Sequence, residues 1–199
     1  GEVFVEEARR IRSDLRQALI GLQDLAQRRV GRVAVAALPS AAAEWMPPVI
    51  ARYRAANPRI KVELYDTLAA TGLSMLRDGR VDIAITAGEE LQEFDCQVLR
   101  QERYFLVCRD DHALASRRSI ALAQAVGPDM MHLARSSSVR QNLQVQLGAS
   151  EAPVDGLEVE HLATLAALVA QGLGIAIVPE LTLFHFQSPA LHTCPVRDA

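Results

Sequence analysis

The sequence predicts an α/β fold, with parallel sheets covered by helices on both faces. Segments typical of strands alternate with segments typical of helices, and several strand segments, such as 174–178, are apolar throughout. Parallel strands need crossover connections and are buried on both faces, which accounts for both observations. The polar strand ends form two clusters in each half of the chain, and this pattern predicts two lobes facing each other across a cleft.

The first 30 residues predict a long helix with a single apolar stripe. The other faces of this helix are charged, and Gly31 ends it after the basic Arg28 and Arg29. Such a stripe has little to pack against except another helix, so we expect a dimerising coiled coil; packing on its own domain is the alternative. The stripe residues recur at alternating spacings of four and three: Phe4, Ala8, Ile11, Leu15, Ala18, Leu22 and Leu25.

A strand–helix–strand unit opens the globular part of the chain. A strand at 32–37 ends just before Ser40, a helix follows up to Pro58, and an alternating strand begins at Ile60. The pair Pro47-Pro48 interrupts the helix, because proline lacks a backbone N–H group. The other elements expected in this half are a helix at 69–77, a strand at 81–86 and a strand at 96–99.

The second half of the chain continues the alternation of strands and helices. A buried strand is expected at 104–108, followed by a polar turn at 109–112. The serines at 136–138 offer N-caps for a helix. The remaining elements expected here are a helix at 120–126, a strand at 130–134, a helix at 139–147, a strand at 157–160, a helix at 162–171 closed by Gly172, a strand at 174–178 and an edge strand at 192–196.

Composition argues against several functions. A net charge of −3, from 21 basic and 24 acidic residues, argues against a nucleic-acid-binding face in this part of the protein. Cys96, Cys108 and Cys194 show neither zinc-ligand nor disulfide spacing, which fits a reduced, cytoplasmic protein. No apolar run of about 18 residues and no secretory leader is visible, so no membrane partner is expected.

The polar residues at the strand ends are the candidate ligand contacts. Ligands of open α/β sheets bind outside the carboxyl ends of the strands. Ser40 leads the candidates, because free backbone N–H groups at the start of a helix favour a small anion such as a carboxylate. The full set is Ser40, Ala41, Thr86, Ala87, Gly88, Ser136, Ser137, Ser138, His161 and Thr164.

These candidates also have purely structural interpretations. Ser40 could cap a helix, Gly88 could form a turn, and His161 could be a hydrogen-bonded group of the fold. Three successive hydroxyls at 136–138 exceed what one cap needs, which favours a polar pocket. Arg140 could neutralise a carboxylate, but an arginine in a first helical turn is more often solvated.

No metal, cofactor or catalytic residue is expected. Asp110, Asp111 and His112 are adjacent on a tight turn and do not converge readily on one ion, so we expect a surface turn there. His192 and Cys194 likewise show no ligand pattern. Because the nucleophile elbow, P-loop, dinucleotide and zinc-protease motifs are all absent, an enzyme is not expected.

Four stretches of the chain resemble the LysR-type transcriptional regulators. They are the heptad helix, GRVAVAALPSAAAEWMPPVIARYRAANPRIKVEL from Gly31, LRDGRVDIAI from Leu76 and HLATLAALVAQGLGIAIVP from His161. The turn DHALA is also similar to the family's His-Pro-Leu-Ala turn, with Ala113 where proline is usual. The resemblance covers nearly the whole chain, from the linker helix through the effector-binding domain.

The resemblance implies a fold like that of periplasmic solute-binding proteins. Two Rossmann-like subdomains would be joined by crossing strands, with the effector in the cleft and the long linker helix ahead of them. Residues 1–30 would form the linker and dimerisation helix, and 31–199 the effector-binding domain. Subdomain I would comprise 31–101 and 179–199, and subdomain II 102–178.

The resemblance also implies a function. The chain would be the effector-sensing and oligomerisation region of a transcription regulator that binds a small, carboxylated molecule and forms a homodimer or homotetramer. Ser40 matches the family's Pro-Ser position, where the hydroxyl commonly contacts the effector. DNA would be bound only through the family's N-terminal helix-turn-helix, which has no counterpart in this sequence. The alternative is a free-standing solute-binding protein of the same fold, which the apolar stripe disfavours.

Overall fold

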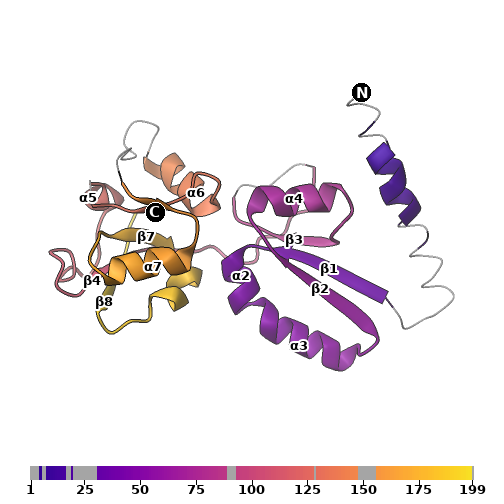
Figure 1. The fold of residues 1–199 in the computed structure, drawn as a ribbon, viewed down its shortest axis with the longest axis horizontal. Coiled ribbons are helices and arrows are strands. Elements are labelled where there is room, and N and C mark those ends of the chain that lie inside the picture. Colours follow the sequence, from indigo (N-terminus) through magenta and orange to yellow (C-terminus); the bar gives the residue numbers. More distant parts are fainter. Residues whose placement is uncertain are drawn as a thin grey trace. The chain divides into compact units, whose positions relative to one another are not determined.

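The computed structural model describes residues 5, 8–16, 19, 31–88, 93–127, 129–147 and 156–198. Its contacts group the chain into two units, Gly1–Ala87 and Gly88–Ala199, which are described separately below. Figure 1 shows the elements of each unit along the chain.

The first unit contains a three-stranded parallel sheet in the order β2-β1-β3. The central strand pairs with its neighbour from Gly31 opposite Ile60 to Ala37 opposite Asp66. The elements are β1 (Gly31–Ala37), α2 (Pro39–Glu44), α3 (Met46–Ala56), β2 (Ile60–Asp66), α4 (Ala69–Arg77) and β3 (Ile83–Ile85).

Helices cover both faces of this sheet, as predicted (Figure 1). On one face, Ala34 and Ala36 pack with Met75 of α4. A Cβ on Gly72 of α4 would lie 3.4 Å from the Cβ of Ala36, so small residues on both elements bring the helix close to the sheet. The helices α2 and α3 lie on the other side, and the break between them falls at Trp45, before Pro47-Pro48.

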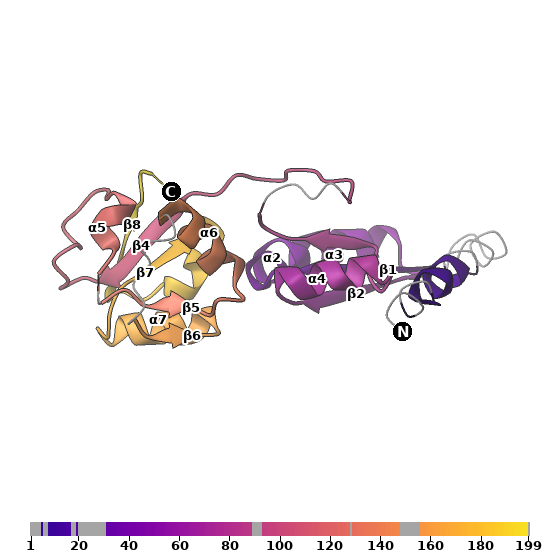
Figure 2. The ribbon, with the colours of Figure 1, turned by 90° about the horizontal axis from the view of Figure 1, so that it is seen from above.

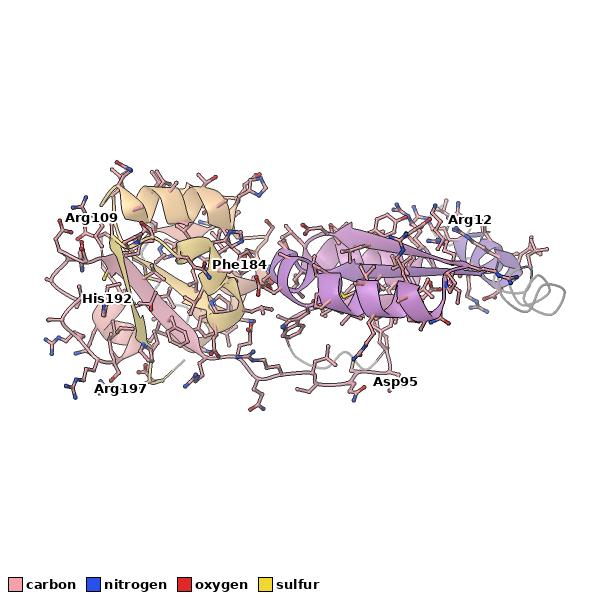
Figure 3. All side chains as sticks on the ribbon, turned by 90° about the horizontal axis from the view of Figure 1, so that it is seen from below. Arg12, Asp95, Arg109, Phe184, His192 and Arg197 are labelled. Atoms are coloured by element: carbon pink, nitrogen blue, oxygen red, sulfur yellow. The ribbon has the colours of Figure 1, made fainter. Side chains whose placement is uncertain are left out.

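The last strand of the first unit is shorter than predicted, because the expected strand at 81–86 pairs only over Ile83–Ile85. The expected strand at 96–99 was wrong, since the structure assigns no strand to 95–103. Figure 3 shows Asp95 on this extended segment. The alternation of apolar residues there resembles a strand, but none of the described strands pairs with it.

The second unit has a three-stranded and a two-stranded sheet, which one bridge links into a single layer, called the second sheet below, with helices on both sides (Figure 2). The strands β7-β4-β8 pair in that order, and β5 pairs with β6. A parallel bridge from Met130 to Ile175 joins the two groups just before β5 and β7 begin. The elements are β4 (Tyr104–Arg109), α5 (Leu122–Ala125), β5 (His132–Leu133), α6 (Ser138–Leu147), β6 (Glu158–Val159), α7 (Leu162–Ala170), β7 (Ala176–Pro179), the 3-10 helix η1 (Glu180–Phe186) and β8 (Leu191–Pro195).

Two hydrophobic clusters fill the two faces of this second sheet. Leu143 of α6 and Leu122 of α5 pack with Met130 and Leu106 on one face. Leu165 and other residues of α7 pack on the opposite face, against Leu133 of β5 and the preceding Met131. The expected helix at 120–126 is only the single turn α5, which still contributes to the first cluster.

The second unit corrects two expectations. Its sheet is mixed, because β4 runs antiparallel to both β7 and β8, while β5 and β6 are parallel as predicted. The segment 179–199 was expected in subdomain I with 31–101. Instead Leu191–Pro195 pairs with β4, so this segment lies in the second unit.

The described part of the N-terminal region, 8–16, is helical. Its stripe residues Ile11 and Leu15 are 64% and 60% exposed, so neither is buried against the described residues. The stripe positions Phe4, Ala18, Leu22 and Leu25 lie outside the described residues. None of the helices described is long and apolar enough to cross a membrane.

Candidate functional site

The two units share one strand order, and it locates a candidate site in each. In the first unit, the strand that follows β1 in sequence pairs on one side of it, and the next strand, β3, pairs on the other side. In the second unit β5 is flanked in the same way by β6 and by the strand leading into β7. Ligands of open α/β sheets bind beyond the carboxyl end of the strand where the order reverses.

In the first unit, the carboxyl ends of β1 and β3 are tied together directly. The N–H of Leu38 donates to the carbonyl oxygen of Ile85 at 3.1 Å. This bond brings the turn that carries Ser40 and Ala41 next to the strand end that leads into 86–88. The predicted residues of the first unit therefore share one sheet edge.

Ser40 is not the N-cap of the helix that follows β1. Leu38 occupies the N-cap position, and Pro39 and Ser40 are the first two helical residues. Capping therefore does not account for the half-buried Ser40 hydroxyl. Because α2 has six residues, its dipole is small, and the hydroxyl and adjacent N–H groups must supply most of any attraction for an anion.

The residues after β3 are open to solvent. Thr86, Ala87 and Gly88 are all exposed. Gly88 has φ of 132°, and no atom lies within 4 Å of where its Cβ would be. The glycine is therefore required by the backbone conformation of a turn and not by a close neighbour.

In the second unit, a matching bond ties the ends of β5 and β6. The N–H of Ala134 donates to the carbonyl oxygen of Val159 at 2.8 Å. Ser137 is the N-cap of α6, because its carbonyl oxygen accepts the first helical hydrogen bond, from the N–H of Gln141 at 3.0 Å. Ser137 and Ser138 are 8% and 9% exposed, whereas Ser136 is open to solvent.

His161 and Thr164 begin α7 at the same edge of the second sheet. His161 is the N-cap residue of α7, without a side-chain capping hydrogen bond. Both side chains are exposed, which does not support the interpretation of His161 as a hydrogen-bonded group within the fold. The structure thus places the ten predicted residues in two sets of five, one after β1 and β3 and one beside β5 and β6, although Gly88 is already the first residue of the second unit. A joint site made from both sets stays a prediction.

Two buried residues beside the second set were not among the predicted contacts. Arg140, in the first turn of α6, is 7% exposed, so the expectation of a solvated side chain was wrong. His132 of β5 is 5% exposed. The Arg140 Nε and the His132 Nε2 are buried and have no hydrogen-bond partner among the described residues.

Both groups have shifted pKa values. Burial lowers the pKa of Arg140. Burial also lowers the pKa of His132 to about 4, and the positive charge of Arg140 adds to that effect. The sequence position of Arg140 on a helix does not reveal that its side chain is buried. The sequence does show a histidine on a predicted strand and an arginine three residues after a serine cap, and this pair could have been considered together.

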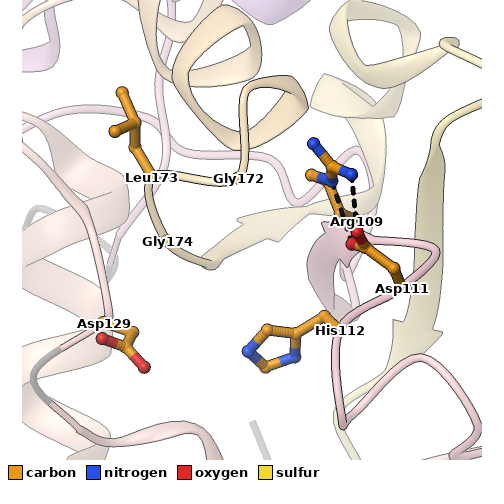
Figure 4. A pocket seen from close by; sticks show the side chains of 7 residues that line it. All are labelled: Arg109, Asp111, His112, Asp129, Gly172, Leu173 and Gly174. Atoms are coloured by element: carbon orange, nitrogen blue, oxygen red, sulfur yellow. Dashed lines mark hydrogen bonds and ion pairs between the residues drawn. The ribbon is translucent and has the colours of Figure 1, made fainter.

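A separate small pocket lies at the opposite edge of the second sheet (Figure 4). It has a volume of about 190 Å³, and an ion pair in its wall joins Arg109 and Asp111. The Arg109 Nε donates to Asp111 at 2.9 Å, which lowers the pKa of Asp111. The other lining residues are His112, Asp129, Gly172, Leu173 and Gly174.

This pocket does not resemble a metal centre. Among the described residues, no group of three or more histidine, cysteine or acidic side chains could hold a metal ion. The left-handed backbone of Gly172, with φ of 75°, closes α7 as predicted, and the Arg109 side chain packs over it. The pocket is therefore shaped by a helix end and a surface turn.

The cysteines form no obvious reactive centre. Cys108 and Cys194 are buried on neighbouring strands, and Cys96 is exposed. Burial, and then the proximity of Cys194, raises the pKa of Cys108 to about 11. Burial also raises the pKa of Cys194. The reactive form of cysteine is the thiolate, so both buried thiols are protected.

Comparisons with known proteins agree on one family. The family model described as the LysR substrate binding domain matches residues 26–199. The chain is 28% identical over 187 residues to the uncharacterised HTH-type transcriptional regulator YbhD of Escherichia coli, covering 93% of this chain and 59% of that protein. It is 24% identical over 187 residues to a hydrogen peroxide-inducible genes activator of Haemophilus influenzae, covering 93% of this chain and 62% of the activator. The chain therefore spans about three fifths of the length of these relatives.

Solved structures show the same fold. The effector binding domain of QuiR in complex with shikimate has a TM-score of 0.74 at 16% identity, over 85% of this chain and 82% of that one. The effector binding domain of BenM with benzoate has a TM-score of 0.72 at 20% identity, over 84% of this chain and 78% of that one. These neighbours have the two-subdomain α/β fold of periplasmic binding proteins.

Proposed function

The chain belongs to the LysR substrate binding domain family, whose model it matches over residues 26–199, and from this membership we propose that it is the effector-sensing and oligomerisation region of a LysR-type transcription regulator. The relatives that it matches are described as transcription regulators. The region would sense a small molecule in the cytoplasm and would not transform it.

The effector site is proposed at the two sheet edges that carry the predicted residues. The observation that carries this proposal is the shared strand order, because it puts a reversal point in each unit. Hydroxyl groups lie at both points, Ser40 in the first unit and Ser137 with Ser138 in the second. In this proposal the effector binds both sets at once and is held between the subdomains.

A small carboxylic acid is the proposed effector class. The first helical turns after β1 and β5 offer hydroxyl and backbone N–H donors, which suit carboxylate oxygens. Two structural neighbours are described as bound to shikimate and to benzoate, and both molecules carry a carboxylate. Their sequences are distant, so they suggest a class of effector and not its identity.

Signalling is proposed to run through the N-terminal helix. The exposed stripe that includes Ile11 and Leu15 would pair with a second copy, giving a homodimer or homotetramer. An effector would shift the subunits only through different affinities for two arrangements of the subdomains. DNA would be bound by a helix-turn-helix domain outside this sequence, as the descriptions of the relatives suggest.

A thermal-shift screen against small metabolites, with aromatic and aliphatic acids first, tests this function. A bound ligand at a hundredfold excess over its Kd stabilises the protein by about 2.7 kcal/mol. Hits should weaken in Ser40→Ala and in Ser137→Ala. The exposed Ser116, on the turn after β4, provides the matched control Ser116→Ala, which should bind like the wild type.

Two results would reject the assignment. A set of hits unaffected by both site variants would move the ligand elsewhere on the protein. If no carboxylic acid binds and only neutral or cationic metabolites do, the proposed effector class is wrong, even if the site is right.

A further inference from the structure

Arg140 and His132 lie on one face of the second sheet. Side chains alternate between the two faces of a strand, and Met130 packs with Leu143 of α6. His132, two residues later, therefore faces α6, the helix that carries Arg140. The positive charge of Arg140 also lowers the pKa of His132, after the larger effect of burial, which agrees with their placement on one face of the sheet.

The positive charge of Arg140 lies in a buried, low-dielectric environment. Arg140 lies in the first turn of α6, where the helix dipole is also positive and disfavours a cation. Its side chain is more than nine-tenths buried, and its Nε has no partner among the described residues. A buried cation is costly unless an anion neutralises it, so this arrangement favours uptake of an anion.

His132 adds a second unused donor to the cluster. Its Nε2 is buried and without a partner among the described residues, and its ring lies against Gly156. A Cβ at Gly156 would overlap the backbone carbonyl oxygen of Met130 and come within 3.3 Å of this nitrogen, so only glycine fits against the strand beside the ring. A neutral imidazole protonated at Nε2 can donate one hydrogen bond to a carboxylate oxygen.

We propose that Arg140 and His132, with the first turn of α6, form the receptor for the carboxylate group of the effector. The inference rests on the proposed function and deepens it, because it assigns the charged end of the ligand to the second unit. Ser137 and Ser138 begin the same helical turn and are also buried, so they complete a set of donors around one anion.

Glu158 is the protein group that could compete for Arg140. It lies opposite His132 in the β5–β6 register, and its charge favours the protonated form of Arg140. Arg135 opposes that effect with its own positive charge. No described ion pair joins Glu158 to Arg140, and Glu158 is exposed, so it leaves the cation available.

Acetate and benzoate, each against its neutral amide, test the receptor directly. The readout is the pKa of the His132 imidazole, followed by NMR on the whole chain. An anion beside the ring should raise this pKa by about one unit. Acetamide and benzamide should leave it unchanged. The response should be absent in Arg140→Met and present in the matched surface control Arg118→Met.

The Glu158→Gln variant distinguishes the effector receptor from an internal ion pair. A response to acetate equal to or larger than that of the wild type supports the receptor. A response that emerges only in Glu158→Gln means that the carboxylate of Glu158 is already paired with the Arg140 guanidinium, which overturns the proposal. The same holds if the wild type responds equally to acetate and acetamide, or if Arg140→Met keeps the response. Should Arg140→Met fail to fold, the wild-type and Glu158→Gln titrations still decide.

Failure of this inference is distinguishable from failure of the proposed function. Metabolite hits that need Ser40 and Ser137 but ignore Arg140 would leave the regulator function intact and reject the receptor. An acetate response that needs Arg140, without any metabolite hit in the screen, would support the receptor and count against the function.

Discussion

The carboxylate of Asp82 accepts a hydrogen bond from the backbone N–H of Ala34 at 2.8 Å, and the N–H of Asp82 returns one of 2.8 Å to the carbonyl oxygen of Ala34. Asp82 directly precedes β3, so its side chain extends the pairing of this short strand along β1. Ala34 is completely buried, and water cannot replace the bond to its N–H group.

Asp82→Ala should therefore destabilise the first unit by about 1–3 kcal/mol, the cost of a buried N–H without an acceptor. Asp82→Asn keeps a side-chain oxygen at the same place and should retain most of the stability. Urea unfolding followed by circular dichroism measures both. An alanine variant as stable as the wild type would show that another acceptor serves Ala34.

Acid should destabilise the second unit through His132. The pKa of its imidazole in the folded protein is about 4, against 6.5 as the ordinary value, because burial disfavours the charged form. The unfolded chain therefore binds the proton first, and stability is complete above pH 6.5 and falls as the pH decreases toward 4. The whole loss is about 3 kcal/mol.

Denaturant unfolding at several pH values in this window provides the measurement. His132→Asn removes the titrating group, so the slope of stability against pH should become shallower. An identical slope in this variant would assign the acid sensitivity to other groups.

The cysteines should differ sharply in reactivity. In the folded protein, a thiol reagent such as DTNB should modify Cys96 alone, because burial protects Cys108 and Cys194 and raises their pKa values. All three should react in guanidinium chloride. Cys96→Ser should leave the folded protein unreactive, and rapid modification of that variant would contradict the buried positions.

This pattern also bears on relatives described as hydrogen peroxide-inducible activators. Peroxide oxidises thiolates, and neither buried cysteine is poised as one. We therefore expect dilute peroxide to leave Cys108 and Cys194 reduced, which mass spectrometry of the intact chain can check.

The exposed stripe of the N-terminal helix should control assembly. Ile11→Lys with Leu15→Lys removes two apolar residues that are more than half exposed, so the chain should shift toward the monomer. Arg12→Gln with Arg16→Gln changes exposed residues of the same helix outside the stripe and is the matched control. Analytical ultracentrifugation decides, and an unchanged mass in the lysine variant would locate the interface elsewhere.

Local pattern was enough to predict most elements of the fold. The apolar segment around Val35, the alternation from Ile60 to Leu64 and the glycine at 172 all act through neighbours in sequence. Periodicity therefore identified the strands and helices that these residues form.

Pairing between distant segments was not predictable in the same way. The direction of β4 and the position of the 191–195 strand depend on which strands meet, and the sequence alone carries no local signal for that choice. The segment 96–99 shows the converse case. Its alternating apolar residues are typical of a strand, but a segment forms a strand only when its backbone can hydrogen-bond to a partner strand.

The site residues show a related limit. The serines at 136–138 were expected to cap a helix, and the structure places Ser137 at the N-cap of α6, whereas its role as a ligand contact stays a prediction. Arg140 was interpreted as solvated, because the residues next to it in sequence do not show that a sheet lies beneath this side of the helix. That sheet forms from strands whose pairing cannot be read from the sequence around Arg140.

Every strand pairing described here joins residues of the same unit, and each unit is continuous in sequence. A chain leaving the ribosome can therefore complete β2-β1-β3 before any strand of the second sheet has been synthesised. Domains that are continuous in sequence fold as units in this order. The apolar strands of the first unit can therefore pair with one another before the residues of the second unit are translated.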